Sequence, residues 1–521
     1  MIVEKRASCI VIHEYTLGAS KYIEKIFSIY DKLTHKFYPY GMYYDEENKK
    51  LYLPNGLDDY YLFKGLDHID NIRRLNNYDN IDEYESIGMV RLSTEPRDDI
   101  QTDAIKFCIG HGRYSDNRYK HQICLNLNTG KGKTYVAITV FAVYAIKTMM
   151  ITSNIEWINQ WKERILEYTD LKPEEIYIVS GMLSIHKLKN GFYKDRNFKF
   201  FLCSHDTLNS YAKKYGWEEL HELFKFLKIG VKIYDEAHLY FNNILMIDFY
   251  TNTWKTYYLT ATPDKSDRFE DRVYKTAFYT IPKIDLFNPE SDPHTKYIAI
   301  MYNSHPTAVD ISRSKNAYGF DRNRYIDYLI TRPNYFKMAH IVLDNAIKNT
   351  SPNGKILVYI GTNRAIMVTY NFLKYIFRNI PIGIFSSLIS KEQKKQELNN
   401  KIILTTTKSA GAALDIHGLE VTIILNEPFN SPVLARQTLG RTRANNTLYI
   451  DLVDTGFKSL MIYYKNKQKI FNRYATGCEI ISYDDYMIDQ SIESLYQEQI
   501  QKQKELENSN QLVQVVTFDK P

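Results

Sequence analysis

The chain is organised around residues 128–134, which read Asn128-Thr129-Gly130-Lys131-Gly132-Lys133-Thr134. An apolar run before them, residues 122–127, predicts a buried strand, and an apolar run after them, residues 135–140, predicts the start of a packed helix. A glycine turn between a strand and a helix lets backbone N–H groups point at phosphate oxygens. Lys133 can reach the terminal phosphates of a nucleotide, and the Thr134 hydroxyl can hold Mg²⁺. The stretch therefore predicts an α/β fold with a phosphate-binding loop.

The loop departs from the general pattern at one position, because Leu127 stands where that pattern has its first glycine. A glycine turn beside a solvated lysine is the simpler alternative. Residues 231–238 argue against it, since they read Val-Lys-Ile-Tyr-Asp-Glu-Ala-His. An apolar strand thus ends in two adjacent carboxylates, Asp235 and Glu236. The first can hold the Mg²⁺ that bridges nucleotide phosphates, and the second can orient or deprotonate the attacking water.

These two stretches resemble motifs I and II of the superfamily 2 helicases, with motif II in its Asp-Glu-Ala-His form. Further stretches resemble the family's other motifs and keep the family's order. They are motif Ia at 152–161, motif Ib at 204–208, motif III at 259–263, motif IV at 358–363, motif V at 405–415 and motif VI at 437–443. The layout is also similar to that of bacteriophage UvsW-type and large-DNA-virus helicases.

The resemblance implies ATP and Mg²⁺ as cofactors, bound in a cleft between two sheets. It assigns nucleotide contacts to Thr129, Gly130, Lys131, Gly132, Lys133, Thr134 and Arg443, metal contacts to Thr134 and Asp235, and catalysis to Lys133, Asp235, Glu236, Gln437 and Arg441. Arg441 is the arginine expected to stabilise charge on the γ-phosphate. Two positions depart from the family: Ala413 replaces a glycine of motif V, and Ala444 stands at the second arginine of motif VI, so that Arg443 falls one residue early.

The segment before motif I contains Gln101, which resembles the family's adenine-recognising glutamine. A glutamine amide offers one donor and one acceptor to the adenine edge. A plain capped helix is the alternative interpretation of this segment. The resemblance also implies nucleic-acid contacts from short hydroxyl or amide side chains, namely Ser153, Gln160, Thr207, Thr362 and Thr407. Such side chains suit phosphate contacts, which position a strand without reading its sequence.

Strand-like and helical stretches alternate twice along the chain, which predicts parallel sheets with helices on both faces. We expect a small N-terminal α+β accessory domain at 1–92, two tandem RecA-like parallel-sheet domains at 93–290 and 291–475, and a C-terminal helical tail at 476–521. Residues 264–292 look like a polar connector. Lys, Arg and Tyr residues of the accessory domain indicate either a DNA-binding surface or an ordinary half-exposed sheet face. The tail is either a helix docked on the body or a partner-binding helix.

Composition limits the class of protein. The 521 residues are 44% hydrophobic and 25% charged, which is typical of a globular chain, and the net charge of +6 requires any nucleic-acid surface to be local. The five cysteines are scattered without a Cys-x-x-Cys pair, which favours a reducing cytoplasm, that of a bacterial host if the chain comes from a phage. We expect no signal peptide and no membrane partner, because the most apolar stretch, 135–146, is too short to span a bilayer.

The sequence thus predicts an ATP-dependent helicase that hydrolyses ATP while moving along single-stranded, forked or branched DNA, in replication, recombination or repair. A duplex DNA translocase and an RNA helicase are alternatives within the same class. A non-catalytic nucleic-acid-binding protein is the alternative from another class, and the intact Lys133, Thr134, Asp235 and Glu236 argue against it. No pattern indicates protein partners.

Overall fold

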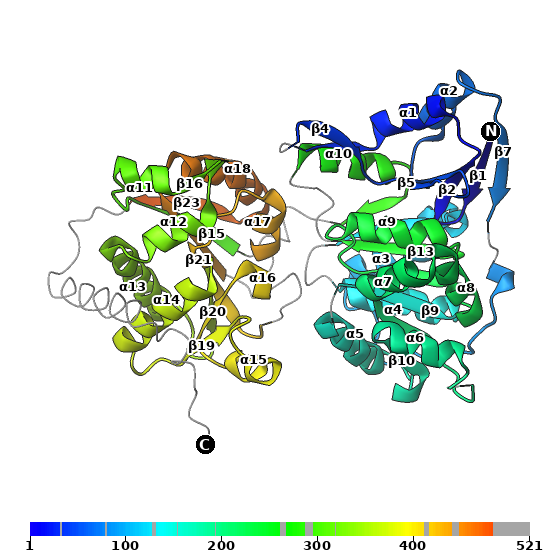
Figure 1. Cartoon of the computed structure of the whole chain (residues 1–521). Helices are drawn as coiled ribbons and strands as arrows, with labels where there is room; N and C mark the ends of the chain where they lie inside the picture. Colours follow the sequence, from blue (N-terminus) through cyan, green and yellow to red (C-terminus); the bar gives the residue numbers. More distant parts are fainter. Residues whose placement is uncertain are drawn as a thin grey trace. The chain divides into compact units, whose positions relative to one another are not determined.

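The protein is described from a computed structural model that covers residues 1–31, 34–78, 81–127, 132–153, 155–192, 194–260, 267–286, 295–317, 319–410, 416–439 and 447–482. The chain divides into two compact units, residues 1–287 and 288–521. In the described residues the largest sheets are one of five strands and two of seven strands (Figure 1).

The N-terminal region of the first unit is α+β, as expected. Its elements are β1 (Ile2–Arg6), β2 (Cys9–His13), α1 (Leu17–Ile26), β3 (Ser28–Asp31), β4 (Lys36–Pro39), β5 (Tyr43–Asp45), β6 (Lys50–Pro54), α2 (Asp59–Asp67) and β7 (Arg73–Asn77). The sheet order is β5-β6-β2-β1-β7, and β3 and β4 form a separate antiparallel hairpin. In this sheet β1 pairs with β2 antiparallel and with β7 parallel.

The first large sheet is parallel throughout and has the order β10-β11-β9-β12-β13-β8-β14. Its elements are α3 (Asp99–Ile109), β8 (Gln122–Asn126), α4 (Lys133–Tyr144), β9 (Thr148–Thr152), α5 (Ile155–Tyr168), β10 (Ile176–Val179), α6 (Gly181–Lys189), β11 (Phe200–Ser204), α7 (His205–Tyr215), α8 (Trp217–Leu227), β12 (Val231–Tyr234), α9 (Phe241–Tyr250), β13 (Lys255–Thr260), α10 (Arg268–Ala277) and β14 (Lys283–Asp285). Alternate side chains fill different clusters, Ile123 and Leu125 in one and Cys124 in the other, so the sheet is covered on both faces.

One expectation about this sheet is wrong. Residues 264–292 were interpreted as a polar connector, but they contain α10 and β14, and β14 pairs in parallel with β8. β14 is three residues long and follows Pro282, so its single buried apolar side chain, Ile284, gives too short a pattern to predict a strand.

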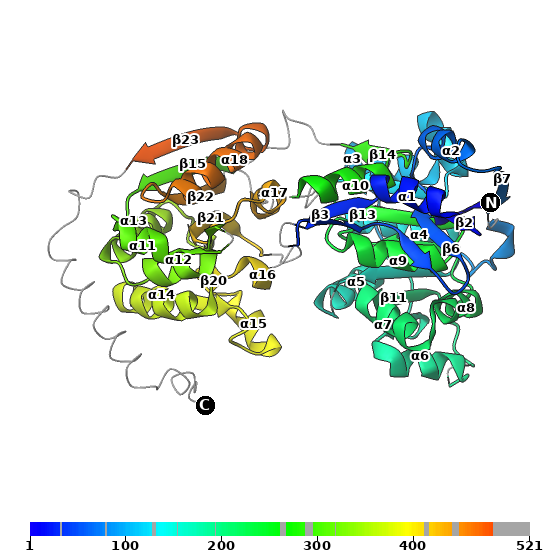
Figure 2. The same ribbon diagram turned by 45° about the horizontal axis from the view of Figure 1, so that its top comes forward.

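The N-terminal region shares a hydrophobic core with the helices of the first large sheet. Tyr52 stacks on Tyr250 with ring centroids 4.9 Å apart, and Trp217 stacks on the same tyrosine, also at 4.9 Å. The backbone N–H of Ala7 donates to Asn252 Oδ1 at 2.8 Å. The region is therefore packed into the first unit, with β2 and β6 against α9 and β3 against α10 (Figure 2).

A buried polar network crosses the same boundary. Lys232 on β12 is fully buried, and its Nζ donates to Asp248 Oδ1 at 2.5 Å and to Ser8 Oγ at 3.2 Å. The other donors to Asp248 are the hydroxyls of Tyr234, at 2.8 Å, and Tyr258, at 2.6 Å. Burial lowers the pKa of Lys232, and the charge of Asp248 opposes that shift. The network links Ser8 of the N-terminal region to side chains of β12 and β13 through Lys232 and Asp248.

The second large sheet is also parallel throughout, in the order β19-β20-β18-β21-β22-β15-β23. The described elements of this unit are β15 (Thr295–Tyr302), α11 (Ala308–Arg313), β16 (Lys315–Asn316), β17 (Gly319–Phe320), α12 (Arg322–Leu329), α13 (Pro333–Lys348), β18 (Lys355–Ile360), α14 (Asn363–Ile376), β19 (Ile382–Phe385), α15 (Lys391–Glu397), β20 (Ile402–Thr405), α16 (Thr407–Ala410), β21 (Leu419–Asn426), α17 (Pro432–Leu439), β22 (Thr447–Asp454), α18 (Lys458–Tyr474) and β23 (Gly477–Ser482). β16 and β17 form a separate antiparallel hairpin. The prediction of two tandem RecA-like sheets with a small N-terminal α+β region is confirmed.

The C-terminal boundary differs from the sequence interpretation. The tail was expected to begin at residue 476, but residues 477–482 form β23, which pairs in parallel with β15. Most side chains of β23 are exposed, so this edge strand lacks the buried alternation that predicts a strand. The helix expected further along the tail lies outside the described residues. Within the described ranges, no helix combines the length and apolar character needed to cross a bilayer.

Candidate active site

Gly132 ends the phosphate loop in a left-handed backbone conformation, with φ of 82°, and caps the N-terminus of α4. The left-handed conformation favours glycine, and a Cβ atom at this position would lie 2.0 Å from Gln101 Nε2, so a larger residue would also displace the Gln101 amide. Lys133 and Thr134 are the first two residues of α4, where the helix dipole favours an anion. Thr129, Gly130 and Lys131 lie outside the described residues.

Gln101 lies against this turn and belongs to a capped helix as well. Its side chain is 4% exposed, and its Oε1 accepts a hydrogen bond from the backbone N–H of Arg97 at 2.8 Å. Asp98 caps the helix, since its Oδ1 accepts from the backbone N–H of Gln101 at 2.8 Å. The capped helix therefore exists and presents Gln101 to the phosphate loop, so the two interpretations of this segment are compatible.

The structure brings Lys133 and Glu236 together, although they are 103 residues apart. Lys133 Nζ donates to Glu236 Oε1 at 3.3 Å, and each side chain is 10% exposed. Glu236 has a φ of 48°, which side chains with a Cβ atom rarely adopt. Such a conformation costs on the order of 1–3 kcal/mol and is concentrated at functional sites. It turns the Glu236 carboxylate toward the lysine at the start of α4.

Asp235 is held by two donors. Trp161 Nε1 donates to Asp235 Oδ2 at 2.8 Å, and the backbone N–H of Glu236 donates to Asp235 Oδ1 at 3.0 Å. Burial and the neighbouring Glu236 raise the pKa of the Asp235 carboxyl, while the charge of Lys133 and the Trp161 hydrogen bond oppose this. Two adjacent carboxylates that repel each other next to one lysine fit a divalent cation, which would relieve the repulsion.

A second contact connects motif II to motif III. His238 and Thr260 are both buried, and His238 Nδ1 lies 2.9 Å from Thr260 Oγ1. The same nitrogen lies 3.4 Å from Glu236 Oε2. Residues 261–266, which include the rest of motif III, lie outside the described residues. The described part already places the end of β13 in contact with the candidate catalytic glutamate through one histidine.

The nucleic-acid candidates of the first unit lie near the same edge of the sheet. Ser153 directly follows β9, and Thr207 lies in the first turn of α7, which directly follows β11. Because β9 and β11 are parallel neighbours, both residues lie at their carboxyl ends, and both are partly exposed. Thr207 Oγ1 lies 2.9 Å from the hydroxyl of Ser204, which caps α7. Gln160 is exposed on α5.

The nucleic-acid candidates of the second unit also lie at the carboxyl ends of neighbouring parallel strands. Thr362 caps α14 after β18, and its Oγ1 accepts from the backbone N–H of Ala365 at 3.1 Å. Thr407 begins α16 after the neighbouring strand β20. Gln437 lies on α17, but its side chain is outside the described part. Arg441 and Arg443 fall within residues 440–446, which are also outside it.

Sequence reasoning missed two partners of the candidate site. Trp161 stands next to a predicted nucleic-acid residue, and no local pattern connects it to Asp235, 74 residues away. Glu427 contacts motif V and was not singled out. Its position two residues after an apolar run, at the end of a predicted buried strand, is the signal that could have identified it.

Two family profiles match the chain. "Type III restriction enzyme, res subunit" matches residues 94–265, and "Helicase conserved C-terminal domain" matches residues 338–445. The transcript termination protein A18 of Yaba-like disease virus is 22% identical over 341 residues, which cover 62% of this chain and 65% of that protein. Protein 161L of Invertebrate iridescent virus 6, named as a helicase, is 22% identical over 373 residues, which cover 68% of this chain and 77% of that protein. This chain therefore spans slightly less than two-thirds of the length of A18.

Solved structures share the fold. The DEAD-box helicase Mss116 bound to ssRNA and UDP-BeF is similar with a TM-score of 0.53 at 14% identity, over 77% of this chain and 77% of that one. The structure of T4 UvsW covers 92% of this chain and 100% of its own, but at 14% identity and a TM-score of 0.35 it supports no argument. The expected likeness to viral helicases is confirmed by the two viral relatives.

Proposed function

The chain belongs to the superfamily 2 helicases, and we propose that it is an ATP-driven motor that moves along DNA and separates its strands. The observation that carries this proposal is the contact of Lys133 with Glu236, with Asp235 beside them. A lysine at the start of the phosphate-loop helix and two carboxylates after β12 of the same sheet form the chemical set that nucleotide hydrolysis requires.

Each of these residues has a separate task in the proposal. Lys133 binds the β- and γ-phosphates, and Thr134 and Asp235 hold Mg²⁺, which when bound supplies positive charge to the phosphate oxygens. Glu236 orients the attacking water and accepts its proton. The Trp161 hydrogen bond favours the charged form of Asp235, as a metal ligand needs.

Strand binding is assigned to the hydroxyls at the carboxyl ends of the strands. The proposed phosphate contacts are Ser153 and Thr207 in the first unit, and Thr362 and Thr407 in the second. Gln160, exposed on α5, is a further candidate of the first unit. Contacts of this kind hold a strand without selecting its sequence, as a motor requires. The resemblance assigns nucleotide contacts to Gln437, Arg441 and Arg443. Because these residues would lose their γ-phosphate contacts on hydrolysis, we propose that hydrolysis changes the affinity of the protein for the strand.

A second candidate function is action on a transcription complex, with RNA or the template strand as the track. The name of the Yaba-like disease virus relative, a transcript termination protein, favours it. The experiment that separates the candidates measures ATP turnover with no nucleic acid, single-stranded DNA, forked DNA and single-stranded RNA, followed by strand displacement on the stimulating class. Lys133→Ala is the inactive control. Stimulation by RNA alone would reject DNA as the track, and equal turnover in all four conditions would reject the motor.

We also propose that the N-terminal region, residues 1–92, adds contacts to duplex or branched DNA. The edge strand β7 supports this, because Arg73 and Arg74 are exposed on it. Truncation is a poor test, since it would uncover the aromatic side chains against which Tyr52 packs. Replacing both arginines by alanine should instead weaken fork binding and flatten its log–log salt slope by about 0.9 for each lost phosphate contact. An unchanged slope would leave β7 without a DNA role.

A further inference from the structure

We propose that the Arg322–Glu427 ion pair, whose carboxylate is buried, is the positioning element that holds the two strand-binding segments of the second unit, motifs IV and V, at a fixed spacing. The inference rests on the proposed function, in which Thr362 of motif IV and Thr407 of motif V bind phosphates of the same strand. Both partners of the pair lie outside the motifs themselves, Arg322 in the first position of α12 and Glu427 directly after β21.

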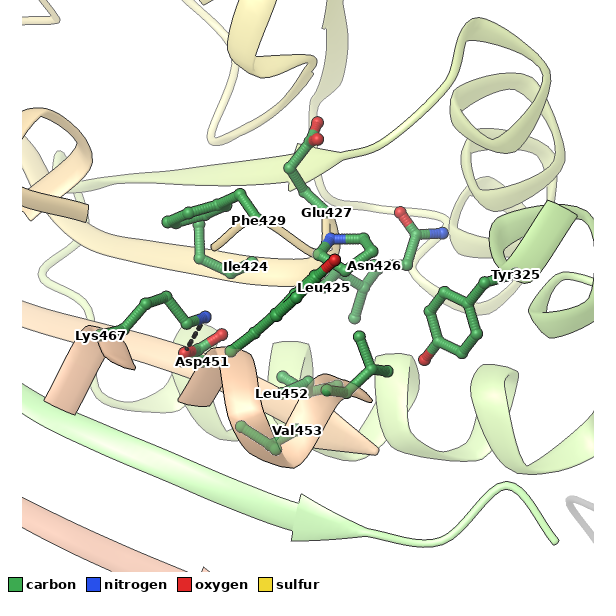
Figure 3. A pocket seen from close by; sticks show the side chains of 13 residues that line it. Tyr325, Ile424, Leu425, Asn426, Glu427, Phe429, Asp451, Leu452, Val453 and Lys467 are labelled. Atoms are coloured by element: carbon green, nitrogen blue, oxygen red, sulfur yellow. Dashed lines mark hydrogen bonds and ion pairs between the residues drawn. The ribbon is translucent and has the colours of Figure 1, made fainter. Parts of the chain in front are cut away.

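Glu427 forms the link to motif V. Its side chain is 2% exposed, and its two carboxylate oxygens have different partners. Oε1 accepts from Arg322 Nη2, and Oε2 accepts from the backbone N–H of Thr407 at 3.4 Å. Figure 3 shows the Glu427 carboxylate pointing away from the neighbouring Lys467–Asp451 ion pair, so the two pairs are separate. The orientation of motif V at Thr407, the first residue of α16, thus depends on a carboxylate from the end of another strand.

Arg322 forms the link to motif IV. The same nitrogen that bonds Glu427 also donates to the backbone carbonyl of Gly361 at 2.5 Å. The N–H of Gly361 donates in turn to Asn426 Oδ1 at 2.9 Å, so side chains hold both polar groups of this residue. A Cβ atom at Gly361 would lie 2.2 Å from Ile326 Cδ1 and 3.0 Å from the carbonyl oxygen of Asn426. Glycine is therefore needed here for the approach of α12.

The two links form one path from Gly361 through Arg322 and Glu427 to Thr407. Thr362 follows Gly361 directly, and its hydroxyl is tied to the first turn of α14, so the phosphate contact moves with this backbone. Binding groups contribute fully only when they are held within about 0.5 Å of the productive geometry. A rigid path between two contacts on one strand supplies that constraint, because it fixes their separation before the strand arrives.

The chemistry of Glu427 allows a test without a change of volume. A carboxylate accepts hydrogen bonds at both oxygens, but an amide accepts at one and donates at the other. Glu427→Gln can therefore serve Arg322 or the N–H of Thr407, and it cannot serve both. The variant breaks the path at one point and leaves the side-chain shape intact.

The experiment measures three quantities in the full-length protein: the nucleic-acid concentration that half-activates ATP turnover, the KM for ATP at saturating nucleic acid, and the unfolding temperature. Glu427→Gln is expected to raise the half-activating concentration roughly tenfold, as for a lost hydrogen bond to a charged group. The KM for ATP stays unchanged. The log–log salt slope of strand binding becomes shallower by up to about 0.7, the value for one phosphate contact on a single strand.

Asp451→Asn is the matched control. Asp451 is an equally buried carboxylate in the same unit, and it accepts from Lys467 Nζ at 2.5 Å and from the Tyr297 hydroxyl at 3.1 Å. Asp451 has no contact with motif IV or V among the described hydrogen bonds. Asp451→Asn is therefore expected to lower the unfolding temperature and to leave the half-activating nucleic-acid concentration unchanged. If the half-activating nucleic-acid concentration rises equally in Glu427→Gln and Asp451→Asn, the Arg322–Glu427 pair is an ordinary structural ion pair and the inference is overturned.

The double variant Arg322→Gln/Glu427→Gln covers the case in which Glu427→Gln does not fold, because it removes both charges of the pair and strands neither of them. This variant is expected to raise the half-activating nucleic-acid concentration to a similar extent, and an unchanged concentration would also overturn the inference. If no nucleic acid stimulates ATP turnover of the wild-type protein, the proposed function itself is rejected, which is a different outcome from a failure of this inference.

Discussion

Replacing Lys232 by methionine should destabilise the first unit by about 3–5 kcal/mol, the usual cost of removing one partner from a buried ion pair. Lys232 is 0% exposed, and its Nζ donates to Asp248 Oδ1 at 2.5 Å, to Thr251 Oγ1 at 2.7 Å and to Ser8 Oγ at 3.2 Å. Methionine preserves the length of the apolar stem, so little cavity is created. The cost comes from the Asp248 carboxylate, which stays buried with two tyrosine hydroxyls as its donors.

Calorimetry can measure this change as a shift of one unfolding transition. The first unit spans residues 1–287, and in domains of about 150–250 residues 1 kcal/mol shifts the midpoint by roughly 2–4 °C. Taking the lower end for a larger unit, we expect a decrease of about 6–10 °C. The second unit should keep its own transition, because every residue of this network lies before residue 288.

Two further variants make the test specific. Lys467→Met breaks the comparably buried pair with Asp451 in the second unit, and it should shift only the transition of that unit. Adding Asp248→Asn to Lys232→Met removes the stranded charge, so the double variant should recover part of the lost stability. A shift below about 2 °C for Lys232→Met, or a double variant less stable than the single one, would refute the reasoning.

Three other predictions concern the chemistry. Glu236→Gln should bind ATP but not hydrolyse it, because an amide cannot accept the proton of water; equilibrium binding beside a turnover assay checks this, and loss of binding would instead make Glu236 a metal ligand. Arg441→Ala should reduce turnover about a thousandfold or more, and Arg443→Ala should reduce it less. If steady-state kinetics give the reverse order, Arg443 is the arginine that stabilises charge on the γ-phosphate. Trp161→Phe removes a donor that favours charged Asp235, so the pKa of this carboxyl rises further and the acidic limb of the pH–rate profile moves to higher pH; an unmoved limb would show that another group titrates there.

Most of the fold follows from local patterns in the sequence. The strands that carry motifs I, II and III are β8, β12 and β13. They are rich in apolar and aromatic residues and are buried at every position, as strands covered on both faces of a parallel sheet are. β14 and β23 could not be found in this way, because the first is too short and the second is mostly exposed. Their pairing depends on backbone groups, which every sequence provides equally.

The sequence pointed to Lys133, Asp235 and Glu236 as separate candidates, but not to the contacts among them and their neighbours. The order of the motifs predicted that Lys133 and Glu236 share a site, and the structure places them in contact. The hydrogen bond of Trp161 to Asp235 joins segments that are distant in the sequence, so no local sequence pattern predicts it. Lys232 did leave a signal, since a lysine inside a strand covered on both faces must find a buried partner. The sequence could not identify that partner as Asp248.

The hydrogen bond between Trp161 and Asp235 also has a spectroscopic consequence. All four tryptophans, at positions 157, 161, 217 and 254, precede residue 288, so intrinsic fluorescence excited at the indole band reports on the first unit alone. One of these indoles touches the carboxylate assigned to Mg²⁺, and another, Trp217, stacks at the boundary with the N-terminal region. The emission of the unlabelled protein can therefore follow two events, metal or nucleotide arrival at Asp235 and release of the N-terminal sheet. Trp161→Phe and Trp217→Phe separate the two signals.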